Sequence, residues 1–258
     1  MAYEKERQIL VQAEKNRVQV DPLSSIVPGG LTLEAAHAIC EANIQARIDG
    51  GDRLRGYKVG YPNPVVRQAL GVPDANYGYV LQSMVLEQAG AFNMKELIGP
   101  RIECEIAFVL KAPLSGPGLT VEDVLAASEG ICAAFEIADA HFKDWKCPYP
   151  DTFADNSFCA RVVLSERLVP ATEFDLTRET AVIYRDGVEL GRGLSDTIMG
   201  HPARSVAWLA GKLAERGRSL RAGDFILTGS VTPIYDMKAP ATYRGTFANL
   251  GVVEKRFV

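Results

Sequence analysis

Two glutamates stand two residues apart inside an apolar segment, "PRIECEIAF", at residues 100–108. The alternation of this segment predicts a strand over residues 101–110, with Glu103 and Glu105 on one face and Cys104 on the other. Two carboxylates this close repel each other unless a cation or a shared proton lies between them. The pair therefore indicates either a solvated strand face or a site for a hard metal ion.

A third acid, Glu136, occupies an equally apolar setting in "ICAAFEIADAHF". A buried, unpaired carboxylate is costly, and a bound metal is one of the few partners that offset the cost. Three carboxylates, with water or substrate in the other positions, would suit octahedral Mg²⁺ or Mn²⁺. Zinc fits less well, because no histidine or cysteine accompanies the acids at ligand spacing. The alternative is that Glu103 and Glu105 face water and Glu136 ends a strand.

Lys58 is a further residue that could act beside such acids. It lies in "LRGYKVG", residues 54–60, whose pattern predicts a short strand. Flanked by glycines and apolar residues, its ammonium could have a functional role as a positive charge or a proton donor. The alternative is a surface lysine at a strand edge.

The elements that would position these side chains are helical at first and mostly strands later. Residues 3–17 and 31–49 predict helices, and Thr32 can cap the second. After residue 100, strands outnumber the widely spaced helices, which favours an α+β or mainly β architecture over a regular βαβ array. We expect a helical N-terminal portion, residues 1–60, packed on a β-rich catalytic domain, residues 61–258, or one continuous unit of both.

Local signals mark elements beyond residue 110. Thr120 and Asp123 predict a capped helix, and Asp186-Gly187 predicts a hairpin turn. The segment "HPARSVAWLAGKLAERG" predicts an amphipathic helix that His201 begins. The expected role of His201 is therefore capping and packing.

Composition narrows the class of protein. The chain has 258 residues with a formal net charge of -4, which argues against nucleic acid or an anionic membrane as a partner. No apolar run is long enough to span a bilayer, and "MAYEKERQIL" lacks the pattern of a signal peptide. The 5 cysteines form no C-x-x-C pair and are expected to be reduced thiols. A cytoplasmic location is the expectation.

Seven segments resemble a known family in the order in which they occur. They are "GYKVG", "PRIECEIAF", "FEIADAHF", "DTFADNS", "MGHPARSVAWLAGKLAERG", "GDFILTG" and "NLGVVEKRFV". This order is similar to the 2-oxopent-4-enoate hydratase and 4-oxalocrotonate decarboxylase family, within the fumarylacetoacetase-like superfamily. The resemblance covers essentially the whole chain. It implies an α+β fold with a mixed β-roll core and a smaller helical N-terminal portion, and homo-oligomers.

The resemblance also implies roles for individual residues. It makes Glu103, Glu105 and Glu136 the ligands of a divalent cation, usually Mg²⁺ or Mn²⁺, and it places Lys58 in the active site. The positions expected to line or support the substrate pocket are Asn76, Asp155, Asn156, Thr228 and Gly229. From the residues alone, Asp155-Asn156 would equally make a turn, and Thr228-Gly229 would equally end a strand.

The implied chemistry acts on small 2-oxo or 2-hydroxy-dienoic acids from the catabolism of aromatic ring-cleavage products. The first expectation is a metal-dependent hydratase that adds water to a 2-hydroxy-2,4-dienoate of the 2-oxopent-4-enoate type. A decarboxylase of a 2-oxo-3-enedioate is an alternative, and Arg161, Lys238 or Arg244 would then meet the second carboxylate. A C–C bond hydrolase, which commonly needs a histidine, and a non-catalytic member in a complex with a partner pathway enzyme are further alternatives.

This sequence departs from the family pattern close to the expected substrate. Tyr61, Pro62 and Asn63 replace the usual Leu-Thr-Ser, and Asn76 stands where hydratases often carry an aspartate. An asparagine can hydrogen-bond but cannot act as a general acid or base. The segment after Gly229 also differs. The expected metal ligands are intact, whereas these departures leave the substrate and the reaction type open.

Overall fold

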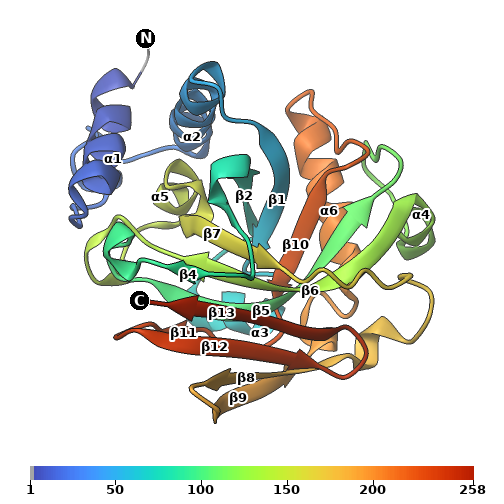
Figure 1. Ribbon diagram of the computed structural model, residues 1–258. Coiled ribbons are helices and arrows are strands. Elements are labelled where there is room, and N and C mark those ends of the chain that lie inside the picture. Colours follow the sequence, from blue (N-terminus) through green and yellow to red (C-terminus); the bar gives the residue numbers. More distant parts are fainter. Residues whose placement is uncertain (1–2) are drawn as a thin grey trace.

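The computed structural model describes residues 3–258. It contains two β-sheets and the helices that cover them (Figure 1). The helices are α1 (Glu4–Asn16), α2 (Leu33–Asp49), α3 (Pro64–Leu70), α4 (Val121–Ala127), α5 (Tyr149–Ala154) and α6 (Pro202–Glu215). The strands are β1 (Leu54–Gly60), β2 (Asn76–Leu81), β3 (Val85–Leu86), β4 (Ala91–Phe92), β5 (Arg101–Leu110), β6 (Ser128–Ala138), β7 (Cys159–Leu164), β8 (Thr180–Arg185), β9 (Val188–Leu194), β10 (Phe225–Ser230), β11 (Tyr235–Asp236), β12 (Ala241–Phe247) and β13 (Gly251–Phe257).

The larger sheet has eight strands in the order β2-β1-β10-β5-β6-β7-β3, and β11 pairs with the start of β5. The strand β1 runs parallel to β10, and β3 runs parallel to β7, while the other neighbours are antiparallel. Figure 1 shows this sheet curling from the steep strands β1 and β10 to the flatter strands β6 and β7. The prediction of an α+β fold with a mixed β-roll core is confirmed.

The smaller sheet has five strands in the order β4-β13-β12-β8-β9 and covers one face of the larger sheet. A Cβ added to Gly245 of β12 would lie 2.8 Å from the Sγ atom of Cys104, so the two sheets are in close contact there. The expected hairpin joins β8 to β9, and Asp186 and Gly187 both have positive φ. Because Cys104 faces this contact, Glu103 and Glu105 face the inside of the curl, as the alternation predicts.

The helices begin at the predicted caps. The Oγ1 atom of Thr32 accepts a hydrogen bond from the backbone N–H of Ala35, and Thr120 and Asp123 form a capping box on α4. The Nδ1 atom of His201 accepts from the backbone N–H of Ala203 at the start of α6. Each cap satisfies backbone donors that a helix leaves free at its first turn, so these boundaries follow from local sequence.

The helices α1 and α2 lie together at one side of the large sheet, and α6 packs on β10 and β1 (Figure 1). The Nε atom of Arg216 on α6 donates to Glu41 on α2 at 2.8 Å, which ties the N-terminal helices to the late part of the chain. The division into residues 1–60 and 61–258 stays a prediction. The strand that carries Lys58 lies before residue 60 and pairs within the large sheet.

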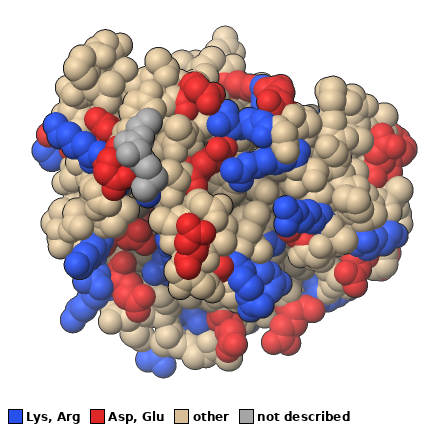
Figure 2. Space-filling model, turned by 90° about the horizontal axis from the view of Figure 1, so that it is seen from above, with Lys and Arg blue, Asp and Glu red and all other residues tan. Residues whose placement is uncertain are grey.

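The surface carries charges of both signs. On the face seen in Figure 2, Lys and Arg side chains alternate with Asp and Glu side chains rather than forming one broad basic field. In residues 3–258, no helix is long and apolar enough to cross a membrane.

Candidate metal centre

The three predicted acids meet on the inner face of the curled sheet. Glu103 and Glu136 are paired across β5 and β6, and Glu105 follows on β5. One oxygen from each of the three carboxylates lies within 4.8 Å of the others, and no other such group of His, Cys, Asp or Glu occurs in residues 3–258. Glu105 and Glu136 are fully buried, whereas Glu103 is partly exposed. The site therefore opens on the side of Glu103.

Three buried carboxylate oxygens of this cluster lack hydrogen-bond donors. Within the described chain, the Oε1 atom of Glu105 and both Oε atoms of Glu136 accept no hydrogen bond. The only ion-pair partner of Glu136 in residues 3–258 is the Nζ atom of Lys58, at 3.1 Å. Buried polar atoms are normally satisfied, and an unpaired buried charge costs several kcal/mol. These bare oxygens fit a hard divalent cation, which prefers carboxylate ligands.

The electrostatics of the acids point the same way. Burial, followed by the negative charge of Glu136, raises the pKa of Glu103 to about 7. Burial and the charges of Glu136 and Glu103 raise the pKa of Glu105 well above its ordinary value. Both causes penalise negative charge, and a divalent cation would offset both.

Lys58 reaches the acids because the sheet is curled. β1 and β6 are separated by β10 and β5, so three strand spacings, about 14 Å, would separate them in a flat sheet. The observed distance of 3.1 Å between Lys58 Nζ and Glu136 Oε1 requires the curl and two long side chains. Burial opposes the charge of Lys58, but Glu136 and Glu103 outweigh it and raise its pKa. The side chain is therefore a buried ammonium aimed at the acids.

Gly229 holds one acid in place. The pairing of β10 with β5 is irregular between Leu227 and Ser230, which frees the backbone N–H of Gly229 to donate to Glu105 Oε2 at 2.6 Å. The φ of Gly229 is 106°, and a Cβ there would lie 2.1 Å from the Cγ atom of Pro62. Only glycine fits both conditions. The hydrogen bond leaves the other oxygen of Glu105 bare.

Thr228 supports this bulge through the backbone. Its hydroxyl donates to the carbonyl oxygen of Ile106 at 3.0 Å, and its own carbonyl accepts from the hydroxyl of Ser205 on α6 at 2.8 Å. A hydroxyl held in this way fixes the strand end beside Glu105. A direct contact of Thr228 with substrate stays a prediction.

Asn76 and Asn156 are engaged by neighbouring elements. The Nδ2 atom of Asn76 donates to Thr152 at 2.9 Å, and its Oδ1 accepts from the hydroxyl of Ser157 at 2.6 Å. The Oδ1 of Asn156 accepts from the backbone N–H of Tyr79, and its Nδ2 donates to the carbonyl of the same residue. Asn156 and Ser157 have positive φ, and these bonds stabilise that turn against β2. Substrate binding by the two asparagines stays a prediction.

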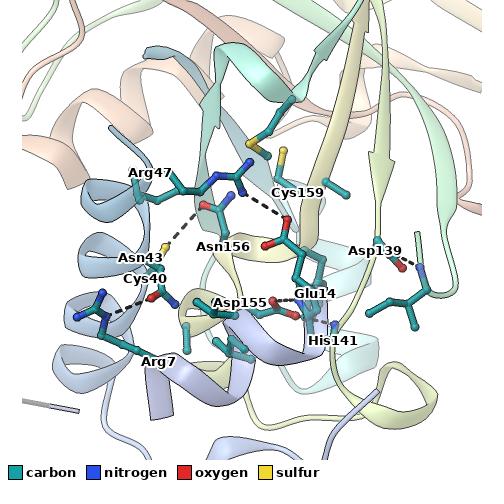
Figure 3. A pocket seen from close by; sticks show the side chains of 18 of the residues that line it. Arg7, Glu14, Cys40, Asn43, Arg47, Asp139, His141, Asp155, Asn156 and Cys159 are labelled. Atoms are coloured by element: carbon teal, nitrogen blue, oxygen red, sulfur yellow. Dashed lines mark hydrogen bonds and ion pairs between the residues drawn. The ribbon is translucent and has the colours of Figure 1, made fainter. Parts of the chain in front are cut away.

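Asp155 lies in a different region, a cavity of about 440 Å³ between α1, α2 and the start of β7 (Figure 3). Asp155 forms a short ion pair with the Nδ1 atom of His141 and accepts from the backbone N–H of His141 at 2.9 Å. Neither Lys58 nor any of the three glutamates lines this cavity. Cys159 is the link between the two regions, because it lines the cavity, and burial followed by the charge of Glu136 raises the pKa of its thiol.

Arg101 and Tyr61 lie on the open side of the acids, and the sequence predicted no role for either, although Tyr61 stands out as a departure from the family pattern. Arg101 precedes Glu103 by two positions on the same strand face, and its guanidinium lies 4.2 Å from the ring centre of Trp145. Tyr61 lies where burial raises the pKa of its phenol and the charge of Lys58 opposes that rise. The Nη1 atom of Arg67 donates to the carbonyl oxygen of Tyr61 at 2.8 Å and fixes its left-handed backbone. The alternation of β5 already places Arg101 on the face of Glu103 and Glu105, and this pattern could have indicated a role for it.

The three cations expected to meet a second carboxylate lie elsewhere. Arg161 pairs with Glu96 and lines the cavity, and Arg244 pairs with Glu254 on the smaller sheet. Lys238 is an exposed side chain near Asp236. Within residues 3–258, none of the three cations forms an ion pair with an acid of the cluster.

The three histidines are also occupied away from the acids. His37 packs against Tyr77 and Phe153, His201 caps α6, and His141 pairs with Asp155. The arrangement therefore offers carboxylates and an ammonium for chemistry, and no imidazole beside them.

Comparisons with known proteins show which family the chain resembles. The pattern of the fumarylacetoacetate (FAA) hydrolase C-terminal family matches residues 61–258. The chain is 35% identical to the 2-hydroxyhexa-2,4-dienoate hydratase of Comamonas testosteroni over 98% of this chain and 97% of that one. It is also 35% identical to the 2-oxo-hept-4-ene-1,7-dioate hydratase of Escherichia coli, over 97% and 96%.

A solved structure extends the likeness to the fold. The 4-oxalocrotonate decarboxylase from Pseudomonas putida G7, complexed with magnesium and adipate, has a TM-score of 0.93 and 29% identity, covering 100% of this chain and 99% of that chain. These relatives are hydratases and a decarboxylase, all lyases, and the decarboxylase holds a divalent metal. The resemblance found in the ordered motifs is confirmed: the chain belongs to the fumarylacetoacetate hydrolase family, beside its dienoate hydratases and 4-oxalocrotonate decarboxylases.

Proposed function

We propose that the protein is a divalent-metal-dependent lyase, and first a hydratase that adds water to a 2-hydroxy-2,4-dienoate of the 2-oxopent-4-enoate type. The observation that carries the proposal is the cluster of buried carboxylate oxygens without donors, beside the ammonium of Lys58. The hydratase relatives at 35% identity over nearly the whole chain support the reaction type. The pathway would be the catabolism of aromatic ring-cleavage products.

The metal would be Mg²⁺, or Mn²⁺, held by Glu103, Glu105 and Glu136. All three donors are hard carboxylate oxygens, which suits these ions better than zinc. When bound, such an ion would supply Lewis acidity that stabilises negative charge developing on a 2-oxo acid.

The residues of this chain would orient the substrate and move protons. The N–H of Gly229 holds one oxygen of Glu105, so that the other faces the centre. In the reaction, C5 of the dienol gains a proton and the 2-hydroxyl loses one, which gives a 2-oxo-3-enoate. The oxygen of water then joins C4 and a proton joins C3. Lys58 is the donor that lies at the acids, and we assign it the transfer of a proton to carbon.

A decarboxylase of a 2-oxo-3-enedioate is the second candidate. The fold likeness to the 4-oxalocrotonate decarboxylase, at a TM-score of 0.93, favours it specifically. In that reaction, the 2-oxo group of the substrate would accept the electron pair that the departing CO₂ leaves behind. A C–C bond hydrolase is less well supported, because all three histidines are engaged away from the glutamates.

One assay separates these candidates. The protein with Mg²⁺ is incubated with 2-hydroxypenta-2,4-dienoate and separately with 2-oxohex-3-enedioate, while ultraviolet absorbance and CO₂ are followed. Loss of dienoate absorbance without CO₂ supports the hydratase, and CO₂ from the enedioate supports the decarboxylase. Activity on neither substrate, with Mg²⁺ or Mn²⁺, would contradict a lyase of either kind.

We further propose that the protein is a homo-oligomer, as the family resemblance implies, that it is cytoplasmic, and that it forms a complex with a partner enzyme of the same pathway. Light scattering on the purified protein tests the first proposal. Co-purification of hydratase and decarboxylase from the same pathway tests the last.

A further inference from the structure

We propose that Arg101 binds the remote carboxylate of a dicarboxylic substrate and so sets a preference for dioic over monocarboxylic 2-oxo acids. This inference rests on the proposed function, because it assumes that a 2-oxo acid is held at the glutamates. It concerns the other end of that substrate, for which the acids and Lys58 provide no partner.

The position of Arg101 follows from the strand. Arg101 and Glu103 are two residues apart on β5, so they lie on the same face and about 6.6 to 6.8 Å apart along the strand. Exposure falls from Arg101 and Glu103, which are partly exposed, to Glu105, which is buried. A substrate held at the acids must therefore leave the site on the side of Arg101.

The guanidinium of Arg101 is held in place by two contacts. It lies 4.2 Å from the ring centre of Trp145, and its Nε atom donates to the Oδ1 of Asp236 on β11 at 2.9 Å. The ring is itself fixed, because the Nε1 atom of Trp145 donates to the carbonyl of Gly99 at 3.2 Å, and Phe158 packs edge-on against it. A stacked guanidinium loses little freedom when it binds a carboxylate.

Arg101 keeps N–H donors that could bind a ligand. A guanidinium has five N–H donors, and within residues 3–258 Arg101 donates a hydrogen bond only from its Nε atom. The edge formed by Nη1 and Nη2 matches the two oxygens of a carboxylate. The side chain is 32% exposed, so a ligand can reach it.

The ligand must reach from the acids to the guanidinium. A six- or seven-carbon dioate spans about 6 to 8 Å between its carboxylate carbons, so its second carboxylate extends well beyond the acids. A five-carbon monoacid would leave the guanidinium without a ligand. Arg101 thus discriminates by charge and length and leaves the chemistry at C2 unchanged.

The test compares two unreactive ligands that differ only at the remote end, 2-oxohexanedioate and 2-oxohexanoate. Their binding to the full-length protein loaded with Mg²⁺ is measured by calorimetry. We expect the wild type to bind the dioate about 10- to 100-fold more tightly, as one charge-assisted pair provides. Arg101→Gln removes this preference while the affinity for 2-oxohexanoate stays the same.

Arg244→Gln is the matched control, because Arg244 also pairs with a single acid but lies on the smaller sheet. It is expected to keep the full preference. An equal affinity of the wild type for the two ligands would overturn the assignment of Arg101. An equal loss of affinity for both ligands in Arg101→Gln would also overturn the assignment, because that result shows a role in the fold alone.

Turnover distinguishes this inference from the proposed function. Arg101→Gln should lower kcat/KM for 2-oxohex-3-enedioate by a similar factor and leave 2-hydroxypenta-2,4-dienoate unaffected. If the wild type turns over neither substrate, the proposed function fails, and the calorimetric preference still decides whether Arg101 reads the second carboxylate.

Discussion

The acid cluster and the cavity between α1, α2 and β7 both contain buried charged groups, but they treat those groups differently. In the cavity, both oxygens of Asp139 accept backbone N–H groups, of Ile98 and Gly99, and Asp155 is paired with His141. In the acid cluster, the Oε1 of Glu105 and both oxygens of Glu136 accept no hydrogen bond in the described chain.

Whether a buried carboxylate already accepts hydrogen bonds distinguishes a structural acid from a candidate ligand better than the size of a cavity does. A carboxylate whose acceptors are all filled stabilises the fold and has nothing left for a ligand. A carboxylate left bare in a buried position costs stability, and a cation that binds there recovers the cost. The cavity between α1, α2 and β7 is thus expected to be a structural region, and the three glutamates are expected to be the reactive one.

The largest expected effect comes from Glu105→Gln. The variant loses one charged ligand, so Mg²⁺-dependent turnover should fall by more than about 100-fold. Without metal, thermal unfolding should be unchanged or occur at a higher temperature, because repulsion among the acids is reduced. Glu129→Gln, an exposed glutamate on the same sheet, is the control for activity. Full activity of Glu105→Gln would refute the metal assignment.

The opposite pattern is expected for Asp155→Asn in the cavity region. Removing one partner of a buried ion pair should lower the free energy of unfolding by about 3 kcal/mol, measured in urea. The affinity of the folded protein for Mn²⁺ should not change. Asp144→Asn, at an exposed aspartate in the connection between β6 and β7, should leave stability unchanged. A raised KM with unaltered stability would instead place Asp155 at the substrate.

The pH dependence of stability sharpens the same contrast. Burial alone would lower the pKa of His141, but Asp155 outweighs it and raises the pKa from 6.5 to about 9. The imidazolium therefore stabilises the fold fully below the unfolded pKa, and up to about 3 kcal/mol is lost as pH rises through the folded pKa.

His141→Gln is the variant that isolates this contribution. The stability difference between wild type and variant should shrink between about pH 6 and about pH 9.5, measured by urea unfolding across that window. A difference that stays constant would show that His141 does not titrate in the expected range.

The smallest effect is expected from Thr228→Val, next to the acids. The change removes the hydrogen bond to Ile106. Stability should fall by about 1 kcal/mol. If the hydroxyl only supports the strand end, KM should stay close to the wild-type value. A raised KM at unaltered stability would give Thr228 a direct contact with substrate and weaken the contrast between supporting and reactive groups.

The sequence predicted what depends on local pattern. Strand alternation placed Glu103 and Glu105 on one face and Cys104 on the other, and capping signals located the starts of α2, α4 and α6. The ordered motifs added the family and strengthened the expectation, first raised by its apolar setting, that Glu136 is a metal ligand. These features follow from neighbours in the chain, which a single sequence contains.

Features that depend on the curl of the sheet could not be predicted in the same way. No local pattern brings Lys58 to Glu136, and none places Trp145 beneath the guanidinium of Arg101. The pairing of His141 with Asp155 was missed for the same reason. The hydrogen bonds of Asn76 with Thr152 and Ser157 belong to this group as well, because their partners lie far along the chain.

The ion pair between Lys58 and Glu136 has a consequence for how the protein folds. It joins two strands that are distant in sequence and separated by two others in the sheet, one of which, β10, is near the end of the chain. Such non-local contacts form late, because loop closure must precede them. The centre is therefore complete only when almost all of the chain is in place. Metal affinity is then a property of the finished sheet, and a truncated or nascent chain should have none.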